Sequence, residues 1–262
     1  MNRIDERFAK MKADGRKALI TFLTVGDPNM EVSEKAIYTM QEEGVDLIEL
    51  GVPFSDPAAD GPVIQRADER ALAQGVDIFK VFELVRKIRN NVEVPMVFLL
   101  YYNVMVQYGI EKFFKCCQET GVDGLIIPDL PYEESDEIKE YTEKYDVYQI
   151  SLVSPTSKDR IKNIAKDAKG FLYCISSLGV TGEKSSFVTN FDEFVGTIKK
   201  YTDVPACVGF GVSNGKQVKE LTKYFDGAIV GSAIVKSIAT GESVEERINN
   251  LREKIKDLKS GL

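Results

Sequence analysis

Hydrophobic positions in this sequence fall into eight short, nearly continuous apolar runs that are separated by segments with helical spacing. Such runs are typical of strands that are buried on both faces of a parallel sheet. The segments between them carry apolar residues three or four positions apart, which is typical of amphipathic helices. The expected strands span Ala18–Val25, Asp46–Leu50, Met96–Tyr102, Gly124–Ile127, Val147–Val153, Gly170–Ile175, Ala206–Val208 and Gly227–Val230.

Two of the expected helices have clear boundaries. One begins after Pro28 and ends near Gly44, because glycine is a common helix terminator. The last helix is preceded by Ser243, which forms a capping box with Glu246. Its apolar stripe consists of Val244, Ile248, Leu251, Ile255 and Leu258. Helices and strands therefore alternate along the chain, which indicates an α/β fold.

Eight strands alternating with helices over 262 residues predict a (β/α)8 TIM barrel, with residues 1–262 forming a single domain. A local repeat supports this count, since 44–48 resembles 121–125 and each stretch runs from a helix end into a strand. An open doubly wound sheet is the alternative, but no Gly-x-Gly-x-x-Gly follows the first strand. Active sites of barrels lie in the loops after the strands, so the candidate residues are sought at carboxyl ends of strands.

Composition excludes several kinds of chemistry. The chain has no histidine, which rules out Ser-His-Asp and Cys-His catalysis and the commonest zinc and iron ligand sets. The net charge of −7 argues against a nucleic-acid partner. The four cysteines form no CxxC pair and are typical of a reducing compartment. Without a signal peptide or a long apolar span, the protein is expected to be soluble and cytoplasmic, with no membrane association.

Glu49 and Asp60 are the clearest candidates for acid–base catalysis. Alternation along the strand 46–50 places Glu49 on the same face as Leu47. If Leu47 points into the barrel, Glu49 does too, and an apolar wall there would raise its pKa and keep it protonated near neutral pH. Asp60 lies in a wetter, Pro- and Gly-rich loop where it stays ionised, so the two carboxyls can act as an acid/base pair. A salt bridge for Glu49 and a turn for Asp60 are the alternative interpretations.

Three further acids, Asp27, Asp56 and Asp129, lie in or near expected strand-to-helix loops. Carboxylate oxygens of this kind can bind a metal ion. Their spacing matches no known metal-binding loop, so no metal site is expected.

Three glycine-rich turns, at 179–182, 209–213 and 231–232, follow the last three strands. The last two lead into helix starts, where free N–H groups and the helix dipole favour an anion. The pattern predicts a phosphate site, with 231–236 as the short extra helix seen in many barrels. Turns that merely need glycine are the alternative.

The long loop 176–190 is expected to be a closing lid or a disordered connection. Several aromatic and apolar residues lie at or near strand ends, namely Phe22, Leu100, Tyr102, Tyr173 and Phe210. They either pack in the core or line a pocket for a flat aromatic substrate.

The longest motif, which runs from Glu49 to Pro57 and on from Asp60 to Gln65, is similar to the signature of the tryptophan synthase alpha subunit family. The stretches 22–28, 179–182, 209–211 and 231–233 are also similar to that family, and the match covers essentially the whole chain in order. The resemblance implies a (β/α)8 barrel that cleaves indole-3-glycerol phosphate to indole and glyceraldehyde 3-phosphate.

The resemblance also implies roles for individual residues. Glu49 matches the family's general acid/base, which protonates the indole ring at C3, and Asp60 matches the carboxylate that binds the indole N–H and stabilises the cationic indolenine. Thr181 matches the lid residue that meets this aspartate on closure. The family's indole pocket corresponds to Phe22, Leu100 and Tyr173, and its phosphate site corresponds to Gly182, Gly211, Gly231 and Ser232. One departure is the run 99–103, which is one residue shorter than in the family.

The family works as an α2β2 complex with a pyridoxal-phosphate beta subunit, which implies a partner for this chain. Pro53, Asp56 and Pro57 lie in the loop that faces the beta subunit, and the alpha chain itself needs no cofactor. Two other functions remain as alternatives: a different phosphate-handling barrel, such as a sugar-phosphate isomerase or aldolase, and a catalytically silent barrel that only activates a beta subunit.

Overall fold

The computed structural model describes residues 1–157, 159–175, 190–209 and 211–262 of the chain. Its parallel strands form one sheet in the order β5-β4-β3-β2-β1-β9-β8-β7-β6. All eight expected strands are present, and they end within a few residues of the expected positions. The strands are β1 Ala18–Thr24, β2 Leu47–Gly51, β3 Met96–Leu99, β4 Gly124–Ile126, β5 Tyr148–Gln149, β6 Leu152–Val153, β7 Leu172–Ile175, β8 Ala206–Gly209 and β9 Gly227–Val230.

The segment 148–153 closes the sheet into a barrel. Its first half, β5, pairs with β4, and its second half, β6, pairs with β7. Backbone bonds continue through the middle, since Ile150 N donates to Leu125 O at 2.8 Å and Tyr173 N donates to Ser151 O at 3.0 Å. The two short strands are therefore one barrel strand, and the architecture is the expected (β/α)8 barrel.

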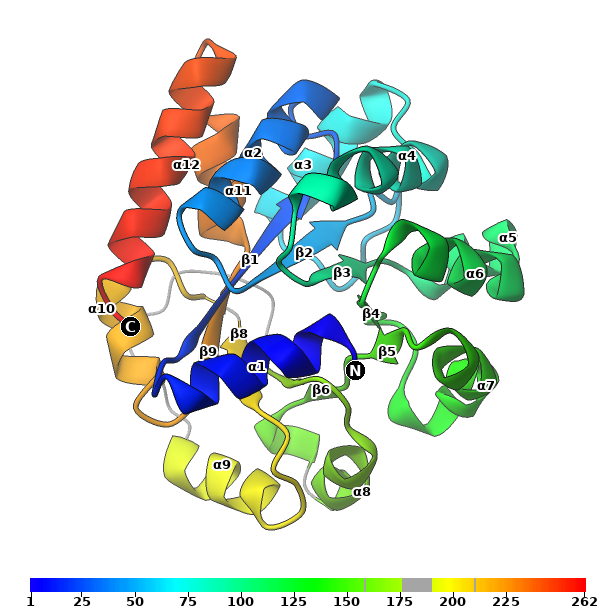
Figure 1. Cartoon of the computed structure of the whole chain (residues 1–262), viewed down its shortest axis with the longest axis vertical. Helices are drawn as coiled ribbons and strands as arrows, with labels where there is room; N and C mark the ends of the chain where they lie inside the picture. The colour runs from blue at the N-terminus through cyan, green and yellow to red at the C-terminus, as the bar shows by residue number, and fades with distance from the viewer. Residues whose placement is uncertain (158, 176–189, 210) are drawn as a thin grey trace.

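Helices cover the outside of the barrel, and α12 packs against both α2 and α11 (Figure 1). The expected boundaries of α2 and α12 are confirmed, and Ser243 Oγ caps α12 by accepting from Glu246 N at 3.1 Å. None of the described helices is both long and apolar enough to cross a membrane. The α-helices are α1 Arg3–Ala13, α2 Met30–Glu42, α3 Pro62–Ala73, α4 Ile78–Ile88, α5 Tyr102–Tyr108, α6 Ile110–Thr120, α7 Asp136–Tyr145, α8 Arg160–Asp167, α9 Phe191–Lys199, α10 Gly215–Leu221, α11 Ser232–Ala239 and α12 Val244–Lys259, with short 3-10 turns at η1 Arg89–Asn91, η2 Tyr132–Glu134 and η3 Pro155–Ser157.

Helix α1 closes the amino-terminal end of the barrel, a feature that the strand pattern did not predict. It crosses the centre of the view in Figure 1, inside the ring of the other helices. Ile4, Phe8 and Met11 share one helix face and are buried in the same cluster as the inward-facing strand residues. Asn2 caps the helix and also donates a 3.0 Å hydrogen bond to Asp123 O, which ties α1 to the barrel wall. Because α1 closes this end, ligands have access to the barrel at the opposite end, where the strands have their carboxyl ends.

Two hydrophobic clusters follow the alternation of the strands. The larger one lies between the strands and the outer helices, and it includes Leu19, Ile48 and Phe98. The smaller one fills the barrel interior, and it includes Ile20 and Leu47. Leu47 therefore points into the barrel, and the next inward position on β2 is Glu49.

Candidate active site

A cavity of about 890 Å³ opens at the carboxyl ends of the strands. Its wall contains Glu49 from β2 and Asp60 from the loop after β2. It also contains Gly211, from the turn after β8, and Gly231 and Ser232, from the turn after β9. The two candidate acids and two of the glycine-rich turns therefore share one cavity, as the sequence predicted.

Glu49 lies on the inner wall of the barrel, with Phe22 and Val97 beside it in the strand register. The residue is 1% exposed, and its Oε1 atom has no hydrogen-bond partner among the described residues. Burial raises the pKa of Glu49 to about 8. The prediction that Glu49 points inward, against an apolar wall that raises its pKa, is confirmed. A buried oxygen without a partner favours the protonated form and is open to a ligand in the cavity.

Asp60 is held by Tyr101, a residue for which the sequence predicted no role. Tyr101 Oη donates a 2.8 Å hydrogen bond to Asp60 Oδ2 and accepts one of 2.9 Å from Ala59 N. The Tyr101 ring stacks on Phe54, with 5.0 Å between the ring centroids. Asp60 is less buried than Glu49, as expected, but burial still raises its pKa, and the Tyr101 hydrogen bond partly offsets this rise.

A second buried acid lies near Asp60. Asp68 on α3 is 4% exposed and accepts a 3.3 Å hydrogen bond from Thr24 Oγ1. Burial, and then the charge of Asp60, raise the pKa of Asp68 to about 8. Spacing within α3 places Ile64, Ala67 and Asp68 on its buried face, which is the only sequence signal that could have pointed to this acid.

The other acids considered from the sequence have structural partners or lie outside the cavity. Asp27 forms a two-pronged ion pair with Arg70, at 2.6 and 2.9 Å. Asp129 accepts bonds from Tyr102 N at the start of α5, at 2.9 and 3.1 Å. Asp56 is exposed. Within the described ranges, no group of three Cys, Asp or Glu side chains is placed to hold a metal ion.

Of the apolar residues expected to line a substrate pocket, Phe22 and Tyr173 line the cavity. Their rings fill the space over two glycines, since a Cβ on Gly51 would lie 2.5 Å from Phe22 Cζ and one on Gly209 would lie 2.6 Å from Tyr173 Oη. Burial, and then the charge of Glu49, raise the pKa of Tyr173, and both side chains line the cavity.

The expectation for Leu100 is wrong. Leu100 is fully buried in the cluster between the barrel and the helices, and the cavity is lined by Leu99 instead. The reason is the alternation of β3: Val97 belongs to the interior cluster, so Leu99 points inward and Leu100 points outward. The expectations for Thr181, Gly182, Phe210 and a lid at 176–190 fall on residues outside those described, apart from Asn190, which caps α9.

The end of the cavity where the sequence predicts a phosphate site is built, among the described residues, from two turns. Gly211 has a φ of +81°, a left-handed conformation that favours glycine. Gly231 is the cap of α11, and Ser232 is its first residue, so the free N–H groups of this helix start border the cavity. The expected short helix after 231 is confirmed as α11. Two cavity residues of this region, Lys236 and Lys254, were missed because they lie on helices beyond the turns.

The three residues expected to face a partner differ in exposure. Asp56 is exposed and Pro57 is half-buried, so both are available at the surface of the loop after β2. Pro53 is buried within this chain. The expectation that Pro53 itself contacts a partner is therefore not supported by its position.

A family model described as tryptophan synthase alpha chain matches residues 8–262. A protein of that description from a Thermoanaerobacter species is 47% identical over 262 residues and covers 100% of both chains. A relative from Methanocaldococcus jannaschii is 46% identical over 238 residues, covering 90% of this chain and 84% of the relative. Among solved structures, tryptophan synthase from Mycobacterium tuberculosis matches with a TM-score of 0.90 and 35% identity, over 99% of this chain and 98% of that one.

Proposed function

The chain belongs to the tryptophan synthase alpha chain family, and we propose that its cavity cleaves indole-3-glycerol phosphate to indole and glyceraldehyde 3-phosphate. One observation carries this proposal: a buried carboxyl whose pKa is about 8 lies in the same cavity as the helix start that borders Gly231. The first group can deliver a proton to a ring carbon, and the second can bind a phosphate.

In the first step, protonated Glu49 donates its proton to C3 of the indole ring. The ring becomes an indolenine cation, whose positive charge is centred on nitrogen. Asp60 accepts a hydrogen bond from the ring N–H, and its negative charge stabilises this cation. The Tyr101 hydrogen bond at 2.8 Å orients the Asp60 carboxylate and favours its ionised form.

In the second step, the bond between indole C3 and the first glycerol carbon breaks. Its electron pair returns to the ring and neutralises the cation, which gives indole. The hydroxyl on the glycerol carbon loses its proton to the Glu49 carboxylate and becomes the aldehyde of glyceraldehyde 3-phosphate. Glu49 thus recovers its proton, so one residue serves first as acid and then as base.

The remaining residues bind and orient the substrate. Phe22, Leu99 and Tyr173 supply an apolar lining that suits a flat indole ring. Gly211, Gly231 and Ser232 offer backbone N–H groups and a helix start for the phosphate. Holding the indole ring and the phosphate of the substrate fixes the reacting carbon beside Glu49, which lowers the entropic part of the activation barrier. Gly182 and Thr181 are proposed to complete the site from the loop after β7.

We further propose that residues 1–262 act as one domain in the cytoplasm, in an α2β2 complex with a beta subunit that holds pyridoxal phosphate. The family supports a beta-subunit partner, and exposed Asp56 and half-buried Pro57 support contact through the loop after β2. Acid–base chemistry with two carboxyls suffices for the cleavage, so this chain is proposed to need no cofactor of its own and to bind neither metal nor nucleic acid.

The experiment that tests the function is a comparison of substrates. Indole release from indole-3-glycerol phosphate is measured for the full chain, alone and with a beta subunit, beside turnover of triose and pentose phosphates. The proposal expects indole release and no turnover of the sugar phosphates. Turnover of a sugar phosphate instead would indicate another barrel enzyme, and partner binding without any indole release would indicate a catalytically silent chain.

A further inference from the structure

Two lysines line the cavity beyond its glycine-rich turns. They are Lys236 on α11 and Lys254 on α12, and they are the only cationic side chains among the described residues of the cavity wall. The acidic residues of that wall are Glu49 and Asp60, which come from β2 and the loop after it. Lysines and acids of the cavity therefore come from different parts of the fold.

Lys236 lies on the same face of α11 as Ser232, the first residue after the turn at Gly231. It follows Ser232 by four residues, which places both side chains on one side of the helix. Its side chain is exposed, and it has no ion pair or hydrogen bond in the part of the chain that the structure describes. The ammonium group is therefore available to an anion that enters the cavity.

Lys254 has a more constrained position. Its Nζ donates a hydrogen bond of 3.2 Å to Ser213 O, in the turn that also contains Gly211. It also pairs with Asp257 Oδ2 at 3.2 Å on its own helix. The side chain is 30% exposed. Lys254 thus connects α12 to the turn after β8 and places a positive charge at the edge of that turn.

We infer that Lys236 and Lys254 select and capture the substrate's phosphate dianion, Lys236 through its unpaired charge and Lys254 also by holding the turn 211–214 in place. The inference rests on the proposed function and specifies how its substrate is recognised. The chain carries a net charge of −7, which disfavours the approach of a dianion. Two ammonium groups on the cavity wall offset this repulsion locally and orient the substrate with its phosphate toward α11 and α12.

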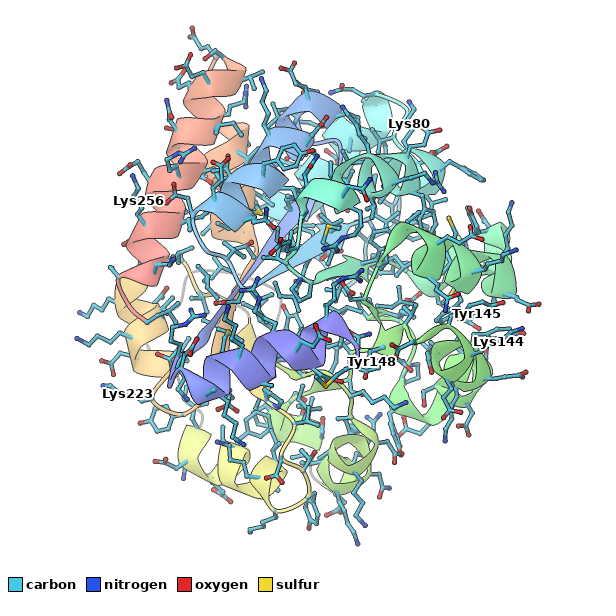
Figure 2. The ribbon with its side chains drawn as sticks, in the orientation of Figure 1. Lys80, Lys144, Tyr145, Tyr148, Lys223 and Lys256 are labelled. Atoms are coloured by element: carbon cyan, nitrogen blue, oxygen red, sulfur yellow. The ribbon has the colours of Figure 1, made fainter. Side chains whose placement is uncertain are left out.

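The test compares Lys236→Gln and Lys254→Gln with Lys256→Gln as the matched control. Lys256 lies on the outer side of α12 (Figure 2), does not line the cavity and pairs with Glu253 at 3.1 Å. For the two cavity variants, KM for indole-3-glycerol phosphate should rise about three- to tenfold with kcat within about twofold of the wild type. The control should keep both constants. Salt screens the attraction between the Lys236 ammonium group and the phosphate. Lys236→Gln lacks this attraction, so higher salt should reduce its kcat/KM less than that of the wild type.

Lys254→Arg keeps the charge and can still donate to Ser213 O, so it should restore KM to within about twofold. Binding of inorganic phosphate, measured by calorimetry, gives a readout that does not need turnover, and it should weaken about three- to tenfold in both Gln variants. KM and phosphate affinity equal to those of Lys256→Gln would overturn the inference. A wild-type chain that releases no indole would refute the proposed function but not the inference about the lysines. Weaker phosphate binding by the two Gln variants would still support their role.

Discussion

Tyr101 Oη donates a 2.8 Å hydrogen bond to Asp60 Oδ2, so the phenol just after β3 fixes the carboxylate on the loop after β2. The hydroxyl also accepts from Ala59 N, and the ring stacks on Phe54. One side chain therefore holds three points of a loop that is rich in Pro and Gly. This contact connects the fold of the barrel rim to the ionisation of the acid that we propose stabilises the indolenine cation.

Tyr101→Phe keeps the stacked ring but removes the hydrogen bond to Asp60. Hydrogen bonds to charged groups contribute about 1.5–3 kcal/mol, so we expect kcat to fall by at least about tenfold. The hydrogen bond lowers the pKa of Asp60, so its loss raises that pKa and moves the acidic limb of the pH–rate profile to higher pH. Steady-state indole release between pH 5 and 9 measures both effects.

The control for this variant is Tyr102→Phe. Tyr102 Oη donates to Glu137 at 2.6 Å, away from the cavity. Its loss should leave the pH–rate profile unchanged. An acidic limb that stays in place in Tyr101→Phe would show that the phenol does not control the ionisation of Asp60.

Leu99→Ala and Leu100→Ala should separate function from stability. Leu99 lines the cavity, so its truncation should raise KM for the substrate, while Leu100 is fully buried outside the barrel, so its truncation should lower the free energy of unfolding by about 2–5 kcal/mol. Kinetics and urea unfolding of both variants measure the difference. The reverse pattern would mean that Leu100, and not Leu99, contacts the substrate.

The stability of the protein should fall as the pH rises from about 4.5 to about 8. The pKa of Glu49 is raised from 4.5 in a solvated chain to about 8 in the fold, so the folded state binds the proton more tightly and loses this advantage as the pH increases. The pH-dependent difference amounts to about 5 kcal/mol at most. Asp68, whose pKa is also raised to about 8, adds a change of the same sign.

Glu49→Gln has no such titration, so its free energy of unfolding should fall less than that of the wild type over this pH range. Urea unfolding at pH 5, 7 and 9 gives the comparison, and Asp68→Asn should flatten the dependence in the same direction. Parallel curves for wild type and Glu49→Gln would show that Glu49 titrates near its ordinary value in the folded protein.

Much of this arrangement could be predicted from the sequence because it depends on local periodicity. Alternation along β2 links Leu47 to Glu49, and the interior position of Leu47 was enough to place the acid inside the barrel. The glycine at 231 identified the helix start of α11, and the glycine at 211 identified the turn before α10, since turns have strong local signals.

The remaining features depend on contacts between segments that are distant in the sequence. Tyr101 reaches Asp60 across 41 positions, and Lys254 reaches Ser213 across 41 positions, so no local pattern reveals either contact. Leu100 was misplaced because its role was taken from the family resemblance, from which the run 99–103 departs by one residue, whereas alternation from Val97 assigns Leu100 outward. The buried face of α1 was visible as the spacing of Ile4, Phe8 and Met11, but a helix that closes a barrel has no signal beyond its amphipathic pattern.

The most direct test of the account is indole release by Glu49→Gln from indole-3-glycerol phosphate, beside the wild type and Glu69→Gln. Glu69 is an exposed residue of α3 and serves as a control for the loss of one carboxylate. Removing the proton donor while keeping its shape should lower kcat by about 10²–10⁴ and leave KM within about threefold. A kcat for Glu49→Gln within about tenfold of the wild-type value would contradict the claim that this carboxyl protonates the ring.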